Sequence, residues 1–300
     1  MRRTLSIAIA GLAILVFALA PAATRATPPA DNARATRPPE VHAIDIVNNH
    51  WAGYMATRDS DGVPIRAVGG QYEVPTVNCL GRKHDGEKLV EWTGLGGGPA
   101  NDHLFQAGTG ATCEGGKPQY YAFWEEFPVS DHSLNQIQKL SAKQYPVKAG
   151  DHIGVSLSYS KDRVEGERID YILQDVGPGP QQSGTVRWEW RSFRPTTGAP
   201  LSGECILERP TVADPTDQDF GPLPRFTPLV FGFAGPAPHN MSGCSVFVDD
   251  KTRYDLTGMA TPWSVYQIRM VSNATGNLLA STSSPTTTSG SFTVTWVSAA

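Results

Sequence analysis

Short runs of β-branched and aromatic residues, separated by clusters of glycine, proline, asparagine, aspartate and serine, constrain the fold of this chain most. Many of these runs alternate polar with apolar residues, as antiparallel strands with one buried face do. The clearest runs span residues 68–75, 88–95, 120–128, 151–160, 168–176, 185–193, 203–210 and 291–298. Only residues 133–143 could support a helix, a short one. So many strands in one domain predict an all-β fold with two antiparallel sheets packed face to face.

The N-terminal segment has the layout of a secretory signal peptide. Two arginines precede an uninterrupted apolar run, residues 5–20, which ends among small residues. A membrane anchor is the alternative, but the run is shorter than the roughly 20 residues that a spanning helix needs. We therefore predict a signal peptide over residues 1–26 and a secreted, extracellular protein. The cleavage site stays open among Ala20, Ala23 and Ala26.

The next segment, residues 27–43, is rich in proline, alanine and charge and has no helical or strand periodicity. We expect a linker or a removable pro-segment there. The remaining residues, 44–300, are enough for one large β-domain. Loss of residues 1–26 would remove three of the 25 basic residues and none of the 29 acidic ones, which leaves a net charge of −7. Such a surface argues against nucleic acid or an anionic membrane as a partner.

Four cysteines in an exported chain indicate two disulfides, for which three pairings are possible. We favour Cys79 with Cys113 and Cys205 with Cys244, because each pair flanks one of the two segments described next. A zinc site is the alternative, but the chain contains neither C-x-x-C nor H-E-x-x-H. We therefore predict no metal and no cofactor.

Two strand segments carry polar residues that packing alone does not explain. In residues 203–210, strand alternation places the carboxyl groups of Glu204 and Glu208 on the same face. In residues 102–110, Gln106 shares a face with small Gly108, which would leave room for another backbone to approach. Both segments suit a site built on the face of a sheet.

Several segments occur in the order found in the eqolisin family of glutamic peptidases, and the chain resembles the bacterial branch of that family most. The matching segments are HWAGY (50–54), EWTGLGG (91–97), LFQAGTG (104–110), YYAFWEEFP (120–128), AGDHIGVSL (149–157), ECILERP (204–210), LPRFTPLVF (223–231) and SFTVTW (291–296). The resemblance implies a concanavalin-like β-sandwich of two large antiparallel sheets, with the active site on the concave face of a curved sheet.

The resemblance also implies site residues. The glutamine of the family's L-Q-x-G type strand corresponds to Gln106, and the second glutamate of its E-x-I-x-E strand corresponds to Glu208. These two would be catalytic. Trp92 corresponds to the tryptophan that lines the substrate cleft, and Glu125 to the glutamate of the W-x-E-x-Y-P type segment, so both would bind substrate. Gly96 stands where the family often has an aspartate, a difference that bears on substrate preference and pH optimum.

A glutamine and a glutamate together suit peptide hydrolysis. The carboxylate of Glu208 would take a proton from the attacking water, while the amide of Gln106 would donate to the developing oxyanion without titrating. With the ordinary glutamate pKa near 4.3, we expect a secreted acid endopeptidase that acts on protein or peptide substrates as a monomer and is insensitive to pepstatin.

Each residue also has an ordinary structural interpretation. Glu208 could form a surface salt bridge with Arg209 or Arg187, and Gln106 could be a hydrogen-bonding residue at a strand end. Trp92 could belong to the core, and Glu125 could be structural.

The same fold also serves other functions. A carbohydrate-binding β-sandwich without catalysis is one alternative. A glycoside hydrolase that pairs Glu208 with Glu125 or Glu204 is the other.

Overall fold

A computed structural model describes much of the chain. The described residues are 43–58, 60–98, 103–127, 137–161, 166–176, 187–192, 198–210, 220–232, 243–249, 252–256, 259, 262–286 and 290–299. The chain divides into two units, residues 1–36 and 37–300, and every described residue lies in the second. The predicted signal peptide, and all of the predicted linker except Ala43, lie outside the described residues and stay predictions.

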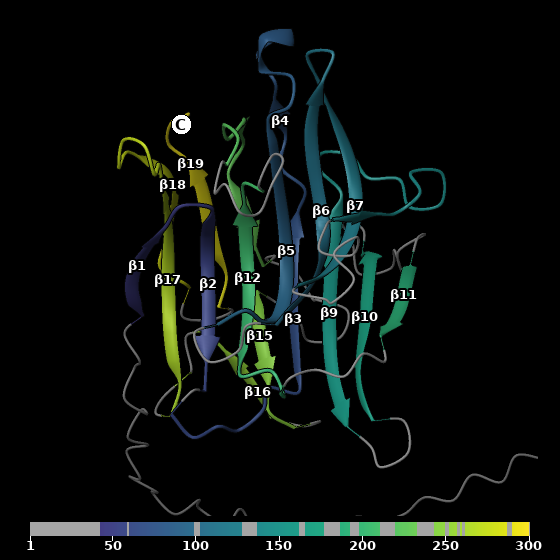
Figure 1. Cartoon of the computed structure of the whole chain (residues 1–300), viewed down its shortest axis with the longest axis vertical. Helices are drawn as coiled ribbons and strands as arrows, with labels where there is room; N and C mark the ends of the chain where they lie inside the picture. The colour runs from purple at the N-terminus through teal and green to yellow at the C-terminus, as the bar shows by residue number, and fades with distance from the viewer. Residues whose placement is uncertain are drawn as a thin grey trace, which may run out of the picture. The chain divides into compact units, whose positions relative to one another are not determined.

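The described residues form β-strands and one short 3-10 helix (Figure 1). The elements are β1 (Ile44–Asn48), β2 (Trp51–Thr57), β3 (Ala67–Glu73), β4 (Val77–Asn78), η1 (Arg82–His84), β5 (Lys88–Gly96), β6 (Leu104–Glu114), β7 (Lys117–Phe127), β8 (Gln138–Lys139), β9 (His152–Lys161), β10 (Glu167–Asp175), β11 (Arg187–Ser192), β12 (Ser202–Glu208), β13 (Arg225–Phe226), β14 (Leu229–Phe231), β15 (Cys244–Phe247), β16 (Arg253–Asp255), β17 (Ser264–Val271), β18 (Leu278–Thr282) and β19 (Phe292–Trp296). The predicted strands therefore form. The possible helix at residues 133–143 was wrong in its described part, where strand β8 and a turn take its place.

One layer of the fold has the strand order β8–β7–β6–β5–β12–β2–β17–β1. Neighbouring strands in it are antiparallel except β1 and β17, which are parallel. Strands that are far apart in the sequence lie side by side here, because β12 pairs with both β2 and β5. This pairing brings the two polar segments identified in the sequence into one sheet.

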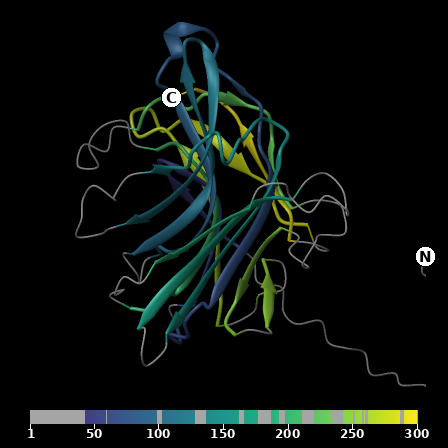
Figure 2. The same ribbon diagram turned by 90° about the vertical axis from the view of Figure 1, so that its right-hand side faces the viewer.

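A second layer runs in the order β11–β10–β9–β3–β15–β16. Strand β14 pairs with β3 and with β19, and β18 joins β19 to β17, so hydrogen bonds connect the two layers into one network. Figure 2 shows the same ribbon in a view turned by 90° about the vertical axis. The predicted all-β sandwich is confirmed.

The main hydrophobic core lies between the layers. Its largest fully buried aromatic side chains are Tyr54, Tyr72, Tyr171, Phe231 and Phe292. The layers approach closely at Gly70 on β3, where a Cβ atom would collide with the side-chain oxygen of Thr93 on β5. Full burial of each large apolar side chain contributes roughly 1.5–3 kcal/mol to the hydrophobic driving force. Alternate residues of β5 and β12 face this core, and the intervening residues of the same strands face away from it.

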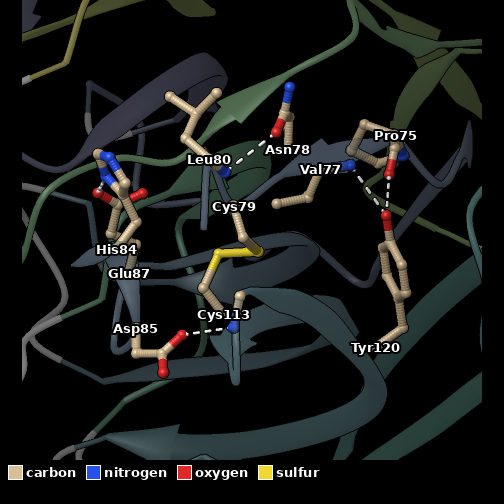
Figure 3. Close-up of a disulfide and its surroundings, with 11 residues drawn as sticks. Pro75, Val77, Asn78, Cys79, Leu80, His84, Asp85, Glu87, Cys113 and Tyr120 are labelled. Carbon is tan, nitrogen blue, oxygen red and sulfur yellow. Dashed lines mark hydrogen bonds and ion pairs between the residues drawn. A yellow bond between two sulfur atoms is a disulfide. The ribbon is translucent and has the colours of Figure 1, made fainter. Parts of the chain in front are cut away.

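Two disulfides form with the predicted pairing. Cys205 on β12 binds Cys244 on β15, which links the two layers directly. Cys79 binds Cys113 and ties the segment after β4 to the end of β6 (Figure 3). Close to this second bridge, the hydroxyl of Tyr120 accepts a hydrogen bond from the Val77 amide at 2.9 Å and donates to the Pro75 carbonyl at 3.1 Å. Covalent and polar contacts therefore hold β4 against the β6–β7 hairpin.

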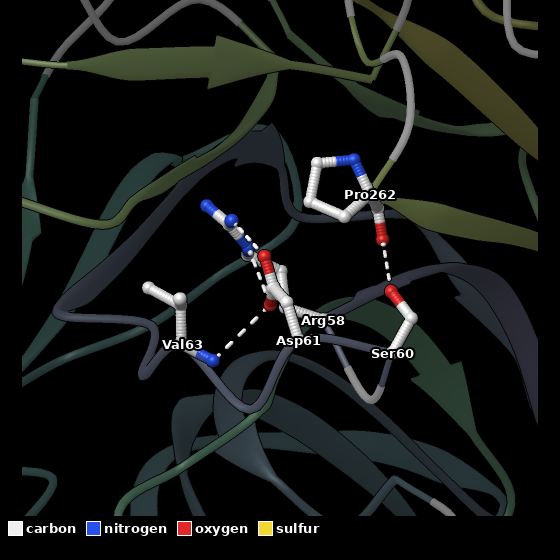
Figure 4. Close-up of polar contacts among 5 residues, drawn as sticks. All are labelled: Arg58, Ser60, Asp61, Val63 and Pro262. Carbon is white, nitrogen blue, oxygen red and sulfur yellow. Dashed lines mark hydrogen bonds and ion pairs between the residues drawn. The ribbon is translucent and has the colours of Figure 1, made fainter.

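The loop after β2 is held by polar contacts of its own (Figure 4). Arg58 forms an ion pair with Asp61, which also accepts a hydrogen bond from the Val63 amide at 3.1 Å. The hydroxyl of Ser60 donates to the Pro262 carbonyl at 3.0 Å, which links this loop to the start of β17.

No helix in the described part of the chain has the length and hydrophobicity of a membrane span.

Candidate functional site

Gln106 and Glu208 lie on the same face of the first layer, the face turned away from the main core, which we call the outer face. Strand alternation places them there together with a second cluster of buried residues. This outer-face cluster consists of Met55, Val90, Trp92, Leu104, Tyr121, Phe123, Ile206 and Ile268. The intervening residues on the opposite face, Phe105, Ala107, Cys205 and Leu207, belong to the main core. The predicted strand faces are therefore confirmed.

The strand register determines the neighbours of each polar residue. Gln106 on β6 lies opposite Glu125 on β7. Glu208 on β12 lies opposite Val90 on β5 and Trp51 on β2. Directly paired residues of neighbouring strands project from the same face. The outer face therefore carries Gln106, Glu125 and Glu208 together.

Glu208 is half-buried and accepts a hydrogen bond from the indole Nε1 of Trp92 at 2.7 Å. Arg209 does not form the salt bridge considered above. Its Nε donates to the Asn49 carbonyl at 2.9 Å, and its Nη1 donates to the Gly221 carbonyl. The other candidate partner, Arg187, has a side chain outside the described residues. Glu208 therefore contacts an indole donor, whereas the alternative ion pair with Arg209 does not form.

Burial and, to a smaller extent, the nearby charge of Glu125 raise the pKa of Glu208 to about 8. The hydrogen bond from the Trp92 indole opposes this shift, because a donor favours the ionised carboxylate. The ordinary glutamate value assumed from the sequence therefore does not apply to Glu208. Such a shift is common for carboxyl groups in functional sites.

Gln106 is 4% exposed and donates from Nε2 to Oε2 of Glu125 at 2.7 Å. The other end of its amide, Oε1, is buried without a hydrogen-bond partner among the described residues. Burial raises the pKa of Glu125 to about 7, against the opposing effect of the Gln106 bond. Glu125 is half-buried, whereas its neighbour Glu126 faces the other way and accepts a hydrogen bond from Tyr171 at 3.1 Å. Glu125 therefore links Gln106 electrostatically to Glu208.

Trp92 is buried, as the core alternative requires, and its role in lining a substrate cleft stays a prediction. Its side chain is fully buried, as a core residue would be, but in the outer-face cluster. Its ring meets that of half-buried Trp51 edge to face, with centroids 5.2 Å apart. A fully buried ring acts on the site through the Nε1 donor to Glu208. Trp51 belongs to the quoted HWAGY segment, but sequence reasoning assigned it no role.

Two further residues on the outer face modify the initial picture. Glu204 lies there as predicted, fully buried, and burial raises its pKa well above the ordinary value, against a smaller opposing effect of the Ser202 hydroxyl. Gly108 lies beside Trp92, where a Cβ atom would collide with the backbone of Glu91 on β5. The backbone that this glycine admits is therefore that of the neighbouring strand.

Another carboxyl group, which sequence reasoning missed, lies behind the site on the core side of β5. Glu91 accepts a hydrogen bond from the Thr109 hydroxyl, and the Tyr72 hydroxyl contacts the Thr109 hydroxyl at 3.1 Å. We call Tyr72, Glu91 and Thr109 the interior cluster. Burial raises the pKa of Glu91 well above its ordinary value. Strand alternation next to Trp92 would have placed Glu91 on this face.

The described residues contain no group of three or more histidine, cysteine, aspartate or glutamate side chains placed to hold a metal ion. The outer face carries the amide of Gln106 and the carboxyl groups of Glu125, Glu204 and Glu208. The fold and the site define an all-β protein in which an amide and several perturbed carboxyl groups share one sheet face.

Comparison with known proteins agrees with this class. Residues 49–296 match the model of the Peptidase A4 family, and the chain belongs to that family. The eqolisin resemblance is thereby confirmed, whereas assignment to its bacterial branch stays a prediction. No curated protein matches the chain.

Solved structures match the fold. Scytalido-glutamic peptidase, with a transition state analog inhibitor, has a TM-score of 0.59 at 17% identity, covering 83% of this chain and 99% of the other. SCP-B, a member of the eqolisin family in complex with the tripeptide Ala-Ile-His, has a TM-score of 0.57 at 16% identity, with the same coverage. At this level of identity the likeness concerns the fold.

Proposed function

We propose that this protein is a secreted glutamic endopeptidase in which Glu208 and Gln106 activate the water that cleaves a peptide bond. One observation carries the proposal: in a member of a peptidase family, Gln106 and Glu208 share the outer face, and Glu125 joins them by a hydrogen bond to one and a charge interaction with the other.

In the proposed reaction, Glu208 removes a proton from water as the water oxygen bonds to the scissile carbonyl carbon. The carbonyl oxygen then carries the negative charge. Glu208 returns its proton to the leaving nitrogen as the C–N bond breaks, so the products are an acid and an amine. A positioned general base contributes on the order of 10² to 10⁴-fold to such a reaction.

Gln106 has the free groups that the second role requires. Its amide nitrogen carries two hydrogens, of which one binds Glu125, so the other can donate to the oxyanion. Its unpartnered Oε1 can accept a hydrogen bond from the attacking water. In this proposal Glu125 positions Gln106 and does not touch the reacting atoms.

The pKa values of Glu125 and Glu208, about 7 and about 8, affect the expected pH dependence. Two interacting carboxyl groups titrate as a pair, and the first proton lost leaves one carboxylate beside one acid. A water that donates to Glu208 further favours its ionised form, so the pKa of Glu208 falls when the nucleophile binds. Because the reaction needs ionised Glu208, these raised pKa values move the expected rise of activity from the acid range towards neutral pH.

The names of the structural neighbours support a peptide as substrate, since one neighbour holds a transition state analog inhibitor and another holds a tripeptide. Two disulfides support export, because disulfides persist in oxidising compartments. A monomer without cofactor is part of the proposal.

The test uses the mature secreted protein with a denatured protein substrate over the range from about pH 3 to pH 8, which separates the acid optimum expected from the sequence from the higher optimum that the raised pKa of Glu208 predicts. We expect cleavage that resists pepstatin, metal chelators and serine reagents. Gln106→Ala and Glu208→Gln should each abolish it while circular dichroism stays unchanged. A Gln106→Ala or Gln106→Glu variant with wild-type activity would contradict the proposal and favour a glycoside hydrolase that uses carboxyl groups alone.

A further inference from the structure

Lys139 on β8 projects from the same outer face as the candidate site. It lies opposite Phe123 on β7, a member of the outer-face cluster. Its Nζ lies 3.9 Å from the ring centroid of Tyr121, another member of the cluster. A cation at this distance over a ring is attracted by the ring face. An exposed ammonium group therefore rests on the buried floor of the outer face.

A second lysine belongs to the same region. Lys88 begins β5 two residues before Val90, so strand alternation puts it on the outer face as well. Burial lowers the pKa of Lys139, exposed Glu114 opposes this shift, and Lys88 adds to it. Among the described residues, neither lysine has a carboxylate within ion-pair distance. Lys88 is therefore close enough to act on the charge of Lys139, and within the described part of the chain neither cation has a direct counter-ion.

The ammonium group of Lys139 lies within reach of a substrate bound at Glu208. Tyr121, Gly110, Val90 and Glu208 follow one another across four adjacent strands. Three strand spacings of about 4.8 Å amount to roughly 14 Å, and an extended peptide advances about 3.3 Å per residue. The charge of Glu208 also contributes to the raised pKa of Tyr121. A peptide lying across the strands would thus pass Lys139 about four residues from the reacting bond.

The other flank of the site offers different chemistry. Beyond Glu208, on β2 and β17, the outer face presents Met55, Ile268 and half-buried Tyr266. None of these described side chains carries a positive charge, so the cations that the structure describes on the outer face lie on the lysine flank.

We propose that Lys139, assisted by Lys88, determines substrate specificity by binding a carboxylate of the peptide about four residues from the scissile bond. The carboxylate comes from an aspartate or glutamate side chain or from the C-terminus of the peptide. This inference rests on the proposed peptidase function and names one substrate feature of the same site.

The experiment uses quenched fluorescent peptides in which glutamate or glutamine is placed at each position up to five residues from the cleaved bond. A separate pair of peptides compares a C-terminal acid with a C-terminal amide. At one position we expect kcat/KM to favour the carboxylate about two- to fivefold at pH 5.5, the range of an exposed ion pair. The preference should vanish at pH 3, where the peptide carboxylate is protonated.

Lys139→Met should remove the preference while it leaves cleavage of the glutamine peptides unchanged. Lys139→Arg should keep the preference, and Lys139→Glu should reverse it. Lys143→Met, which removes an exposed lysine from the turn after β8, is the matched control and should behave as wild type. Retention of the preference in Lys139→Met, or its equal loss in Lys143→Met, would overturn the inference.

Failure of the proposed function would appear differently, because no peptide would then be cleaved. In that case fluorescence anisotropy with the same peptides measures binding directly. Tighter binding of the carboxylate peptide by wild type than by Lys139→Met would support the lysine site, and equal binding would refute it.

Discussion

Glu208 on the outer face and Glu91 on the core side of β5 both have a raised pKa, yet the two carboxyl groups differ in access to solvent. Glu91 in the interior cluster is 1% exposed and bonds Thr109, whereas Glu208 is half-buried and bonds Trp92. Burial is the largest cause of both pKa shifts. A raised pKa alone therefore does not distinguish a reactive carboxyl group from a structural one.

What separates the two groups is their neighbours. Glu208 has a second titrating carboxyl group, Glu125, close enough to raise its pKa, and Glu125 is bonded to Gln106. Glu91 has hydroxyl groups around it, from Thr109 and from Tyr72. Hydroxyl groups can satisfy a protonated carboxyl group in a core, whereas the amide and second carboxyl group near Glu208 can also serve a reaction.

The largest expected difference between the two groups appears when Glu208 and Glu91 are each exchanged for glutamine. Glu208→Gln should lower kcat by about 10² to 10⁴-fold, because it removes the general base. Glu91→Gln should change kcat less than about threefold, since glutamine resembles the protonated form that burial favours. Steady-state kinetics of both variants test the comparison. Equal losses would show that the two faces do not differ in function.

A smaller effect is expected from Trp92→Phe, which keeps an aromatic ring but removes the donor to Glu208. A hydrogen bond to a charged group contributes about 1.5–3 kcal/mol, so kcat/KM should fall about 10- to 100-fold. The lost donor favoured the carboxylate, so the pKa of Glu208 should rise further and the acid limb of the pH profile should move to higher pH. A proportional loss at every pH would assign Trp92 a packing role alone.

The interior cluster should appear in the pH dependence of stability. The folded-state pKa of Glu91 is raised above its unfolded value near 4.5, so the folded state binds this proton more tightly. The contribution of this proton to the free energy of unfolding is full below about pH 4.5. It falls by about 1.4 kcal/mol per pH unit as pH rises towards the folded-state pKa of Glu91. Urea unfolding of Glu91→Gln between pH 4 and 7 should show a shallower decline than wild type. Identical slopes would contradict the predicted burial of a protonated Glu91.

Of the substitutions on the outer face, Glu125→Gln should have the smallest effect. Removal of this neighbouring acid takes away a charge that raises the pKa of Glu208, so that pKa should fall and the acid limb of the profile should move to lower pH. Since the amide can still contact Gln106, kcat at the optimum should drop less than about tenfold. An unmoved acid limb would show that Glu125 and Glu208 titrate independently.

Much of the fold was predictable because strand alternation is a local property. The period of two alone separated Gln106 from Phe105 and Glu208 from Leu207, and composition between the turns predicted the all-β class. The short segment around β8 misled the prediction, because two residues paired with β7 carry too weak a periodic signal to be told from a helix. That segment carries Lys139, which sequence reasoning therefore passed over.

By itself, then, the sequence determined which side chains share a face within each strand, since the direction of a side chain follows from backbone geometry. Only the tertiary structure decided which strands pair and in what register, and so that Glu125 lies opposite Gln106 and that the ring of Trp92 reaches Glu208. The raised pKa of Glu208 is likewise a tertiary property, because it arises from burial and from a charge on a strand remote in sequence.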